Sequence, residues 1–111
     1  MKTCEPIGRI ELTNQGGFVV KMDFVFLARN GRHVRLPGSR KDITLGRSEC
    51  QDPGDFGMPD CAEFTIHADV VWGRDNVGPV WFVYDPCSAR KAKFTISGTT
   101  LHNRLGFNGI E

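Results

Sequence analysis

A short stretch near the carboxyl end of the sequence, Gly98-Thr99-Thr100-Leu101, places a hydroxyl group beside an aliphatic side chain directly after an alternating segment. Glycine allows the chain to turn sharply where a strand ends, so the residues that follow are expected in a loop. In such a loop, Thr100 and Leu101 could present a hydroxyl and an aliphatic side chain to a ligand outside the protein. The residues alone leave open an ordinary turn in which Leu101 folds under and caps the core.

A second loop, residues 73–79, lies between two tryptophans, Trp72 and Trp81. Tryptophan favours sites with one apolar and one wet side, such as membrane interfaces and sugar platforms. If neighbouring strands alternate in direction, this loop and the Gly-Thr-Thr-Leu loop emerge at the same end of the fold. We therefore expect Trp72, Val77 and Leu101 to be the apolar residues at this end. Trp81 is a further binding candidate, although each tryptophan could equally pack against the core.

A basic segment is predicted in a hairpin whose turn contains Asn30-Gly31, the dipeptide preferred in tight type I′ turns. With His33 beside them, these residues could bind sulfated glycans, anionic head groups or phosphate. The alternative is that charges on an exposed strand prevent edge-to-edge aggregation. The residues of this basic patch are Arg29, Arg32, Arg35, Arg40 and Lys41.

Four cysteines, Cys4, Cys50, Cys61 and Cys87, allow three disulfide pairings, and none of them forms a Cys-x-x-Cys pair typical of a zinc site. A Cys50–Cys61 disulfide would close the long loop of residues 47–61, and Cys4–Cys87 would be the second pair. Two disulfides indicate an exported domain. Four reduced thiols in a cytosolic protein remain the alternative.

The sequence offers little to nucleophilic or metal chemistry. The three histidines fall on separate predicted strands or turns, and no nucleophile elbow or zinc-protease helix is present; they are His33, His67 and His102. Three aspartates in the long loop match no calcium-binding spacing and are expected to be solvated; they are Asp52, Asp55 and Asp60. We therefore predict a protein that is not an enzyme and has no cofactor or metal.

Charge and composition limit the possible partners. The 111 residues carry a net charge of +1, so no overall field attracts nucleic acid. No apolar run approaches the ~20 residues that a membrane helix needs, and the first ten residues lack the apolar centre of a signal peptide. We expect a secreted protein whose signal is not in this sequence, with a cytoplasmic location as the alternative.

Alternation with period two indicates strands through most of the chain. The strongest, Phe18–Arg29, has an apolar face that includes Phe24, while Lys21 and Asp23 mark the other face as mostly wet. The remaining strands are predicted from similar alternation at 7–14, 42–46, 62–72, 80–85 and 93–97, with a short one within 101–110. Short strands separated by Gly- and Pro-rich turns predict one all-β domain over residues 1–111, an antiparallel β-sandwich of about seven to eight strands. Its central strands should be 18–29, 62–72 and 93–97, and its core should contain Phe24, Phe64, Ile66 and Ile96.

The order of several blocks resembles the C-terminal β-sandwich domain of the cholesterol-dependent (thiol-activated) cytolysins. "GGFVVKMDFVF" is similar to the opening of a long strand in that domain, and "VWFVYDPCSARKAKFTISGTTL" is similar to its final descent to Gly-Thr-Thr-Leu. The resemblance covers nearly the whole chain at low identity. It implies that Thr100 and Leu101 recognise membrane cholesterol from a loop at the tip of the sandwich.

The sequence also departs from that family. The region from about Val71 to Trp81, which corresponds to the family's tryptophan-rich undecapeptide, contains no cysteine and only two tryptophans. The pore-forming domains that precede the sandwich in the family are absent from this sequence. The resemblance therefore predicts a stand-alone module that binds a sterol-containing membrane or a glycan. A lectin-like module, or a secreted effector or defence protein acting on a protein partner, is the alternative.

Overall fold

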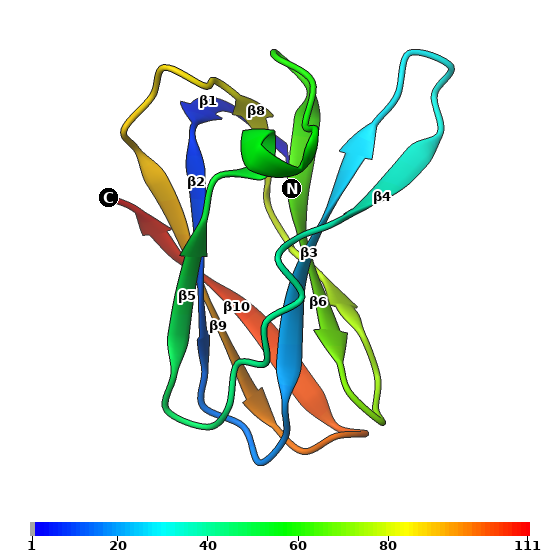
Figure 1. Ribbon diagram of the computed structural model, residues 1–111, viewed down its shortest axis with the longest axis vertical. Helices are drawn as coiled ribbons and strands as arrows, with labels where there is room; N and C mark the ends of the chain where they lie inside the picture. The colour runs from blue at the N-terminus through cyan, green and yellow to red at the C-terminus, as the bar shows by residue number, and fades with distance from the viewer. Residues whose placement is uncertain (1) are drawn as a thin grey trace.

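The computed structural model describes the backbone of residues 2–111 and the side chains from Glu5 onward. Within this part of the chain, ten strands form two sheets that pack face to face (Figure 1). Sheet A has the order β1-β8-β6-β3-β4, with β7 paired to β6, and sheet B has the order β10-β9-β2-β5. The strands are β1 Lys2–Ile7, β2 Arg9–Asn14, β3 Val20–Leu27, β4 His33–Pro37, β5 Ser48–Gln51, β6 Glu63–Val70, β7 Asn76–Val77, β8 Trp81–Tyr84, β9 Lys91–Gly98 and β10 Asn103–Ile110.

The predicted all-β sandwich is confirmed, and the three strands expected at its centre, now β3, β6 and β9, each have neighbours on both sides. Most strand pairs are antiparallel, but β1 pairs with β8 and β2 pairs with β9 in parallel. The parallel pairs arise because the first extended segment, interrupted at Gly8, contributes β1 to sheet A and then β2 to sheet B. Alternation in the sequence could not reveal this switch between sheets.

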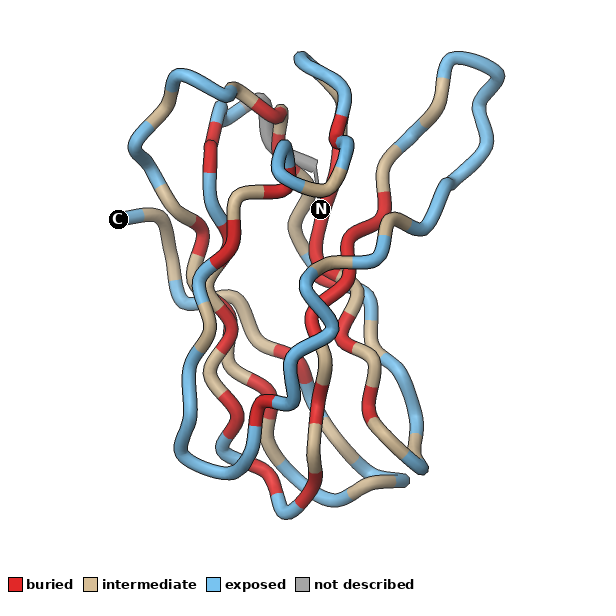
Figure 2. The backbone as a smooth tube through the Cα atoms, in the orientation of Figure 1, coloured by how far each residue is buried: buried red, intermediate tan, exposed pale blue. Residues whose placement is uncertain are grey.

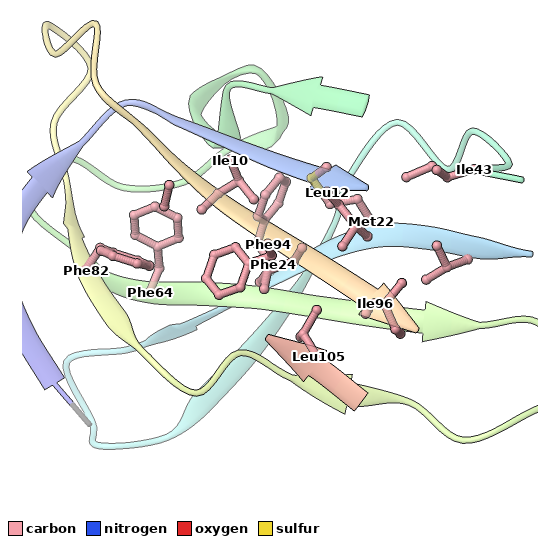
Figure 3. Packing of buried hydrophobic residues seen from close by; sticks show 14 of the residues in the cluster. Ile10, Leu12, Met22, Phe24, Ile43, Phe64, Phe82, Phe94, Ile96 and Leu105 are labelled. Carbon is pink, nitrogen blue, oxygen red and sulfur yellow. The ribbon is translucent and has the colours of Figure 1, made fainter. Parts of the chain in front are cut away.

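Apolar side chains from both sheets meet in one core (Figure 3). All four residues predicted for the core, Phe24, Phe64, Ile66 and Ile96, have no exposed surface. Aromatic rings then join the sheets: Phe82 of sheet A packs edge-on against Phe94 of sheet B, with ring centroids 6.1 Å apart. Period-two alternation therefore identified the inward face correctly, because successive side chains of a strand point to opposite faces.

The predicted hairpin of β3 and β4 is confirmed, with Leu27 opposite His33, but its turn is not type I′. The Gly31 N–H donates to the Ala28 carbonyl, and the Ala28 N–H donates to the Arg32 carbonyl. Only Gly31 has positive φ, at 82°, whereas a type I′ turn requires it at both central residues. The hairpin therefore has a longer loop that closes with one left-handed glycine.

One strand prediction and one loop prediction are wrong between β4 and β6. Residues 42–46 do not form a strand, because only Ile43 makes a bridge, to Val20. The expected long loop of residues 47–61 begins instead with β5, which pairs with β2, and continues through a single 3₁₀ turn at Pro53–Phe56. The polar composition of this segment concealed an edge strand.

The predicted disulfides are also wrong where the structure describes them. Cys50, Cys61 and Cys87 are free and exposed, and the side chain of Cys4 lies outside the described residues. Cys50 lies in β5 of sheet B, whereas Cys61 precedes β6 of sheet A and donates its backbone N–H to the Tyr84 carbonyl. The two cysteines therefore belong to different layers of the sandwich.

A hydrogen bond fastens this loop in place of a disulfide. The Tyr84 hydroxyl donates to Asp52 Oδ1 over 2.5 Å, and the same oxygen accepts the Gly54 N–H at the start of the 3₁₀ turn. Burial, followed by the hydrogen bond to Asp52 and the charge of that carboxylate, raises the pKa of Tyr84. The aspartate that sequence analysis left in solvent therefore has a structural role.

Stability should consequently depend on the ionisation of Tyr84. Because its pKa is raised in the folded state, its contribution is complete below about pH 10, where an unfolded tyrosine ionises, and declines as the pH rises further. Tyr84→Phe should lower the free energy of unfolding by about 1.5 kcal/mol near neutral pH and should lose this alkaline dependence. Urea unfolding of both proteins between neutral and alkaline pH measures the difference. Tyr84 is the only tyrosine, so ultraviolet titration reports it alone, and native titration near pH 10 would contradict the assignment.

Candidate functional site

Two loops from different sheets lie side by side at one end of the sandwich, as expected from the sequence (Figure 1). The Arg74 N–H donates to the Thr100 carbonyl over 2.8 Å. Asn103 Nδ2 then donates to the carbonyls of both Arg74, at 2.9 Å, and Thr100, at 3.1 Å. The loop after β6 and the loop after β9 are therefore held together as one surface.

The Gly-Thr-Thr-Leu loop is an exposed turn and not a plug for the core. Gly98 has φ 105°, and a Cβ there would lie 2.3 Å from the His102 carbonyl oxygen, so the turn requires glycine. Thr99 closes the turn, because its N–H donates to the His102 carbonyl and its hydroxyl accepts the His102 N–H. Leu101 is 62% exposed. The Thr100 hydroxyl makes no hydrogen bond with another described residue, which leaves it available to a ligand.

Trp72 has an unusual conformation for a bulky residue. Its φ is 64°, in the left-handed region that residues other than Gly, Asn and Asp seldom adopt. Its side chain is 94% exposed. Neither backbone preference nor burial explains a tryptophan here, and strained residues of this kind cluster at functional sites. Val77, in the short β7, is about half exposed beside this loop.

A third loop brings an apolar residue that sequence analysis missed. Leu45 is 64% exposed in the turn before β5, where the Gly46 N–H donates to the Asn14 carbonyl at the end of β2. In Figure 2 this turn is among the exposed segments at the same end of the sandwich as the other two loops. We call the set Leu45, Trp72 and Leu101 the apolar tip. The only sequence signal for Leu45 was a Thr-Leu pair like that at Thr100.

Trp81, by contrast, lies away from the apolar tip. The carbonyl of the preceding residue, Val80, accepts a hydrogen bond from the Thr65 hydroxyl. Thr65 lies five residues, or about 17 Å along the strand, before Val70, where β6 ends at the tip. The Trp81 ring lies 5.1 Å from the imidazole of His33, between ring centroids. The structure therefore separates Trp81 from the other predicted binding residues and groups it with the β3–β4 hairpin.

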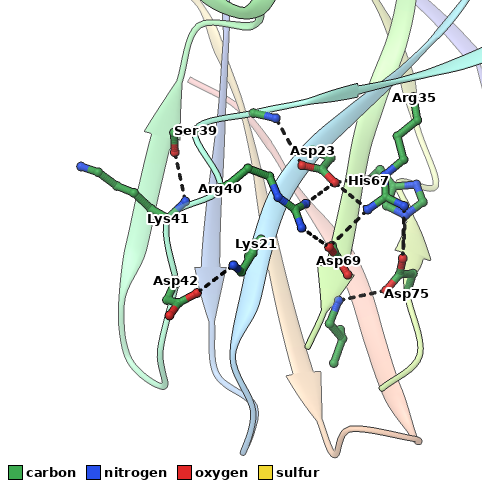
Figure 4. Close-up of polar contacts among 12 residues, drawn as sticks. Lys21, Asp23, Arg35, Ser39, Arg40, Lys41, Asp42, His67, Asp69 and Asp75 are labelled. Carbon is green, nitrogen blue, oxygen red and sulfur yellow. Dashed lines mark hydrogen bonds and ion pairs between the residues drawn. The ribbon is translucent and has the colours of Figure 1, made fainter. Parts of the chain in front are cut away.

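The predicted basic patch is not one surface. Arg35 and Arg40 both turn towards Asp23 of β3, whose side chain is 1% exposed, each with a contact of 2.6 Å to Asp23 Oδ2 (Figure 4). Lys41 lies 3.7 Å from Glu49, while Arg29 and Arg32 remain exposed in the turn of the hairpin. Asp23 was expected on a wet face, but the two arginines cover it.

The same cluster extends to the loop that carries Trp72. Asp69 accepts a hydrogen bond from Arg40, and Asp75 contacts His67 Nε2 at 2.9 Å while accepting the Val70 N–H at the end of β6 (Figure 4). Burial raises the pKa of Asp69, but the hydrogen bond and charge of Arg40, with the charge of Arg35, outweigh it and lower the pKa overall. The cluster thus fastens one side of the tip loop to the outer face of sheet A.

The described part of the chain contains neither a metal-binding cluster nor a helix that could span a membrane. Its residues include no group of three or more His, Cys, Asp or Glu able to hold a metal ion. None of its helices has the length and apolar character to cross a bilayer. The end surface combines exposed apolar side chains with the Thr100 hydroxyl, which makes no hydrogen bond with another described residue.

Solved toxin structures share this fold. A Gram-negative toxin matches with a TM-score of 0.51 and 21% identity, over 91% of this chain and 22% of its own. Listeriolysin O matches with a TM-score of 0.50 and 16% identity, over 91% of this chain and 22% of its own. This chain has the fold of the membrane-binding domain of the cholesterol-dependent cytolysins. It spans less than a quarter of either toxin.

The isolated membrane-binding domain of pneumolysin matches over 92% of this chain and 96% of its own, with a TM-score of 0.48 and 16% identity. No protein-family model matches the sequence, and no curated protein matches it. At these identities the likeness to the cytolysin domain concerns the fold.

The buried carboxylate of Asp23 should be important for stability. Asp23→Asn removes the charge that two arginines share, and we expect the free energy of unfolding to fall by about 2 kcal/mol. The loss is limited because both arginines are partly exposed and can hydrogen-bond water instead. The melting temperature, measured by thermal unfolding, should fall by roughly 8–16 °C. The control Asp42→Asn removes only an exposed partner 3.4 Å from Lys21 and should change stability by less than about 1 kcal/mol. Equal effects of the two substitutions would contradict this role for Asp23.

Proposed function

We propose that this protein is a non-catalytic binding module that docks on sterol-containing membranes through the apolar tip. The observation that carries the proposal is the joint exposure of Leu45, Trp72 and Leu101 at one end of the molecule. Hydrogen bonds join the loops of Trp72 and Leu101 to each other, and another fixes the Leu45 turn to the end of β2. Exposed apolar residues gathered in this way mark membrane or ligand contacts. The fold shared with listeriolysin O agrees with such a role.

Thr100 supplies the polar half of the proposed sterol site. A sterol carries one hydroxyl at head-group level above its rings, which suits a free threonine hydroxyl next to an exposed leucine. In this proposal Thr100 hydrogen-bonds the sterol hydroxyl and Leu101 lies against the rings. Thr99 suits this role less well, because its hydroxyl oxygen already accepts the His102 N–H within the turn.

The expected affinity of one module is modest. Burial of three large apolar side chains gives about 1.5–3 kcal/mol each, and one hydrogen bond adds roughly 0.5–1.5. Association costs reduce the sum, so dissociation constants between micromolar and millimolar lipid are expected. Stronger attachment would need several modules acting together. In this proposal the protein acts outside the cell. The location rests on the proposed role alone, because the described residues form no disulfide.

Vesicle flotation tests the proposal. Wild-type protein should float with phosphatidylcholine vesicles that contain cholesterol and not with vesicles that lack it. Thr100→Ala combined with Leu101→Ala should weaken binding by roughly 30-fold or more, from the loss of one apolar contact and one hydrogen bond. The melting temperature should stay within a few degrees, because Leu101 is mostly exposed.

The matched control is Leu27→Ala, which removes a 37% exposed leucine from the β3–β4 hairpin and should leave flotation unchanged. In a Trp81→Phe background Trp72 is the only tryptophan, and its emission should shift to the blue when vesicles bind. Binding that ignores cholesterol, or a double variant that floats like wild type, would refute the sterol site.

A further inference from the structure

We propose that a cationic hollow beside Leu101 binds the phosphate of an anionic phospholipid headgroup. The inference rests on the proposed function, because it assumes that the apolar tip meets a membrane. The hollow has a volume of about 420 Å³ and lies where β9 and β10 meet the tip loop that follows β6. Its lining consists of Arg74, Ser97, Gly98, Leu101, His102, Asn103 and Arg104.

The charge of this hollow is one-sided. Two arginines and a histidine line it, and none of its lining residues carries a carboxylate. The guanidinium groups of Arg74 and Arg104 form no ion pair with a described residue. Arg35 and Arg40, in contrast, are neutralised by Asp23 and Asp69. The arginines at the tip are therefore available to an outside anion.

The fold brings these groups together from three separate elements. Arg104 pairs with Ser97 across β9 and β10, one step from the terminal pair of Gly98 and Asn103. Asn103 holds the Arg74 loop against this end through its hydrogen bond to the Arg74 carbonyl. Two guanidinium groups and a hydroxyl can thus converge on one ligand, and the planar fork of arginine suits phosphate oxygens.

The depth of the hollow favours a lipid phosphate as the ligand. Leu101 is at the exposed turn, and Arg104 lies one ladder step behind its base, a rise of about 3.4 Å. The polar region of a bilayer is roughly 5–8 Å thick on each side of the hydrocarbon. If Leu101 enters the hydrocarbon, Arg104 and Arg74 therefore lie at the level of the headgroup phosphates.

The test replaces part of the phosphatidylcholine in cholesterol vesicles by phosphatidylserine. Wild-type binding should strengthen by roughly fivefold for each engaged arginine, about 30-fold for two, and the gain should shrink with added salt. Arg74→Gln with Arg104→Gln should abolish this gain. The control Arg29→Gln with Arg32→Gln removes the same charge from the exposed hairpin turn and should retain it.

The outcomes separate the alternatives. A gain that survives in Arg74→Gln/Arg104→Gln, or that falls equally in both double variants, overturns the headgroup site. Amide shifts at residues 97–104 on titration with inorganic phosphate, without a gain from phosphatidylserine, would assign the hollow to free phosphate and also overturn the proposal. Failure of the sterol function would give a different result: wild-type protein would bind neutral vesicles equally well with and without cholesterol.

Discussion

The end surface of this molecule depends on hydrogen bonds that join the two sheets where their strands stop. Asn103 donates from one amide nitrogen to the carbonyls of Arg74 and Thr100, which belong to loops of different sheets. Asn14, fully buried at the end of β2, donates to the carbonyls of Phe18 and Ile43 and accepts the Gly16 N–H. Each asparagine side chain donates to the carbonyls of two residues outside the strands and so ties separate loop segments to one point. Without these bonds the loops would emerge from a common core but would not share one surface.

These hydrogen bonds hold apolar and strained residues at the solvent-exposed end of the molecule. Trp72 keeps a left-handed backbone and a nearly fully exposed ring because both sides of its loop are fixed, by Thr100 on one side and by Asp75 on the other. Order in the free state lowers the entropic cost of binding, since the loops need not be arranged when a ligand arrives. The cluster around Asp23 therefore contributes to the tip from a distance, by holding the strand from which its loop departs.

Charge is divided between two regions with different roles. On the outer face of sheet A, Arg35 and Arg40 surround a buried carboxylate and form structural ion pairs. Around the hollow at the tip, Arg74 and Arg104 form no ion pair with any residue that the structure describes. A net charge of +1 conceals this division, because carboxylates gather beside the first pair and are absent from the lining of the hollow.

The sequence by itself determined the class of fold, the inward face of the main strands and the turn at Gly98, because these depend on local alternation and on backbone freedom. The exposure of Leu101 in that turn was decided by the tertiary structure. Burial of Phe24 and Ile96 followed directly from period two. Only the tertiary structure decided which strands are neighbours, and with that which distant residues meet. It paired Asp23 with two arginines, placed Leu45 in a turn at the tip and Trp81 away from it, and put Cys50 and Cys61 in different layers of the sandwich. A strand's pattern records which side of a sheet a residue faces, but it carries no information on the strand that lies beside it.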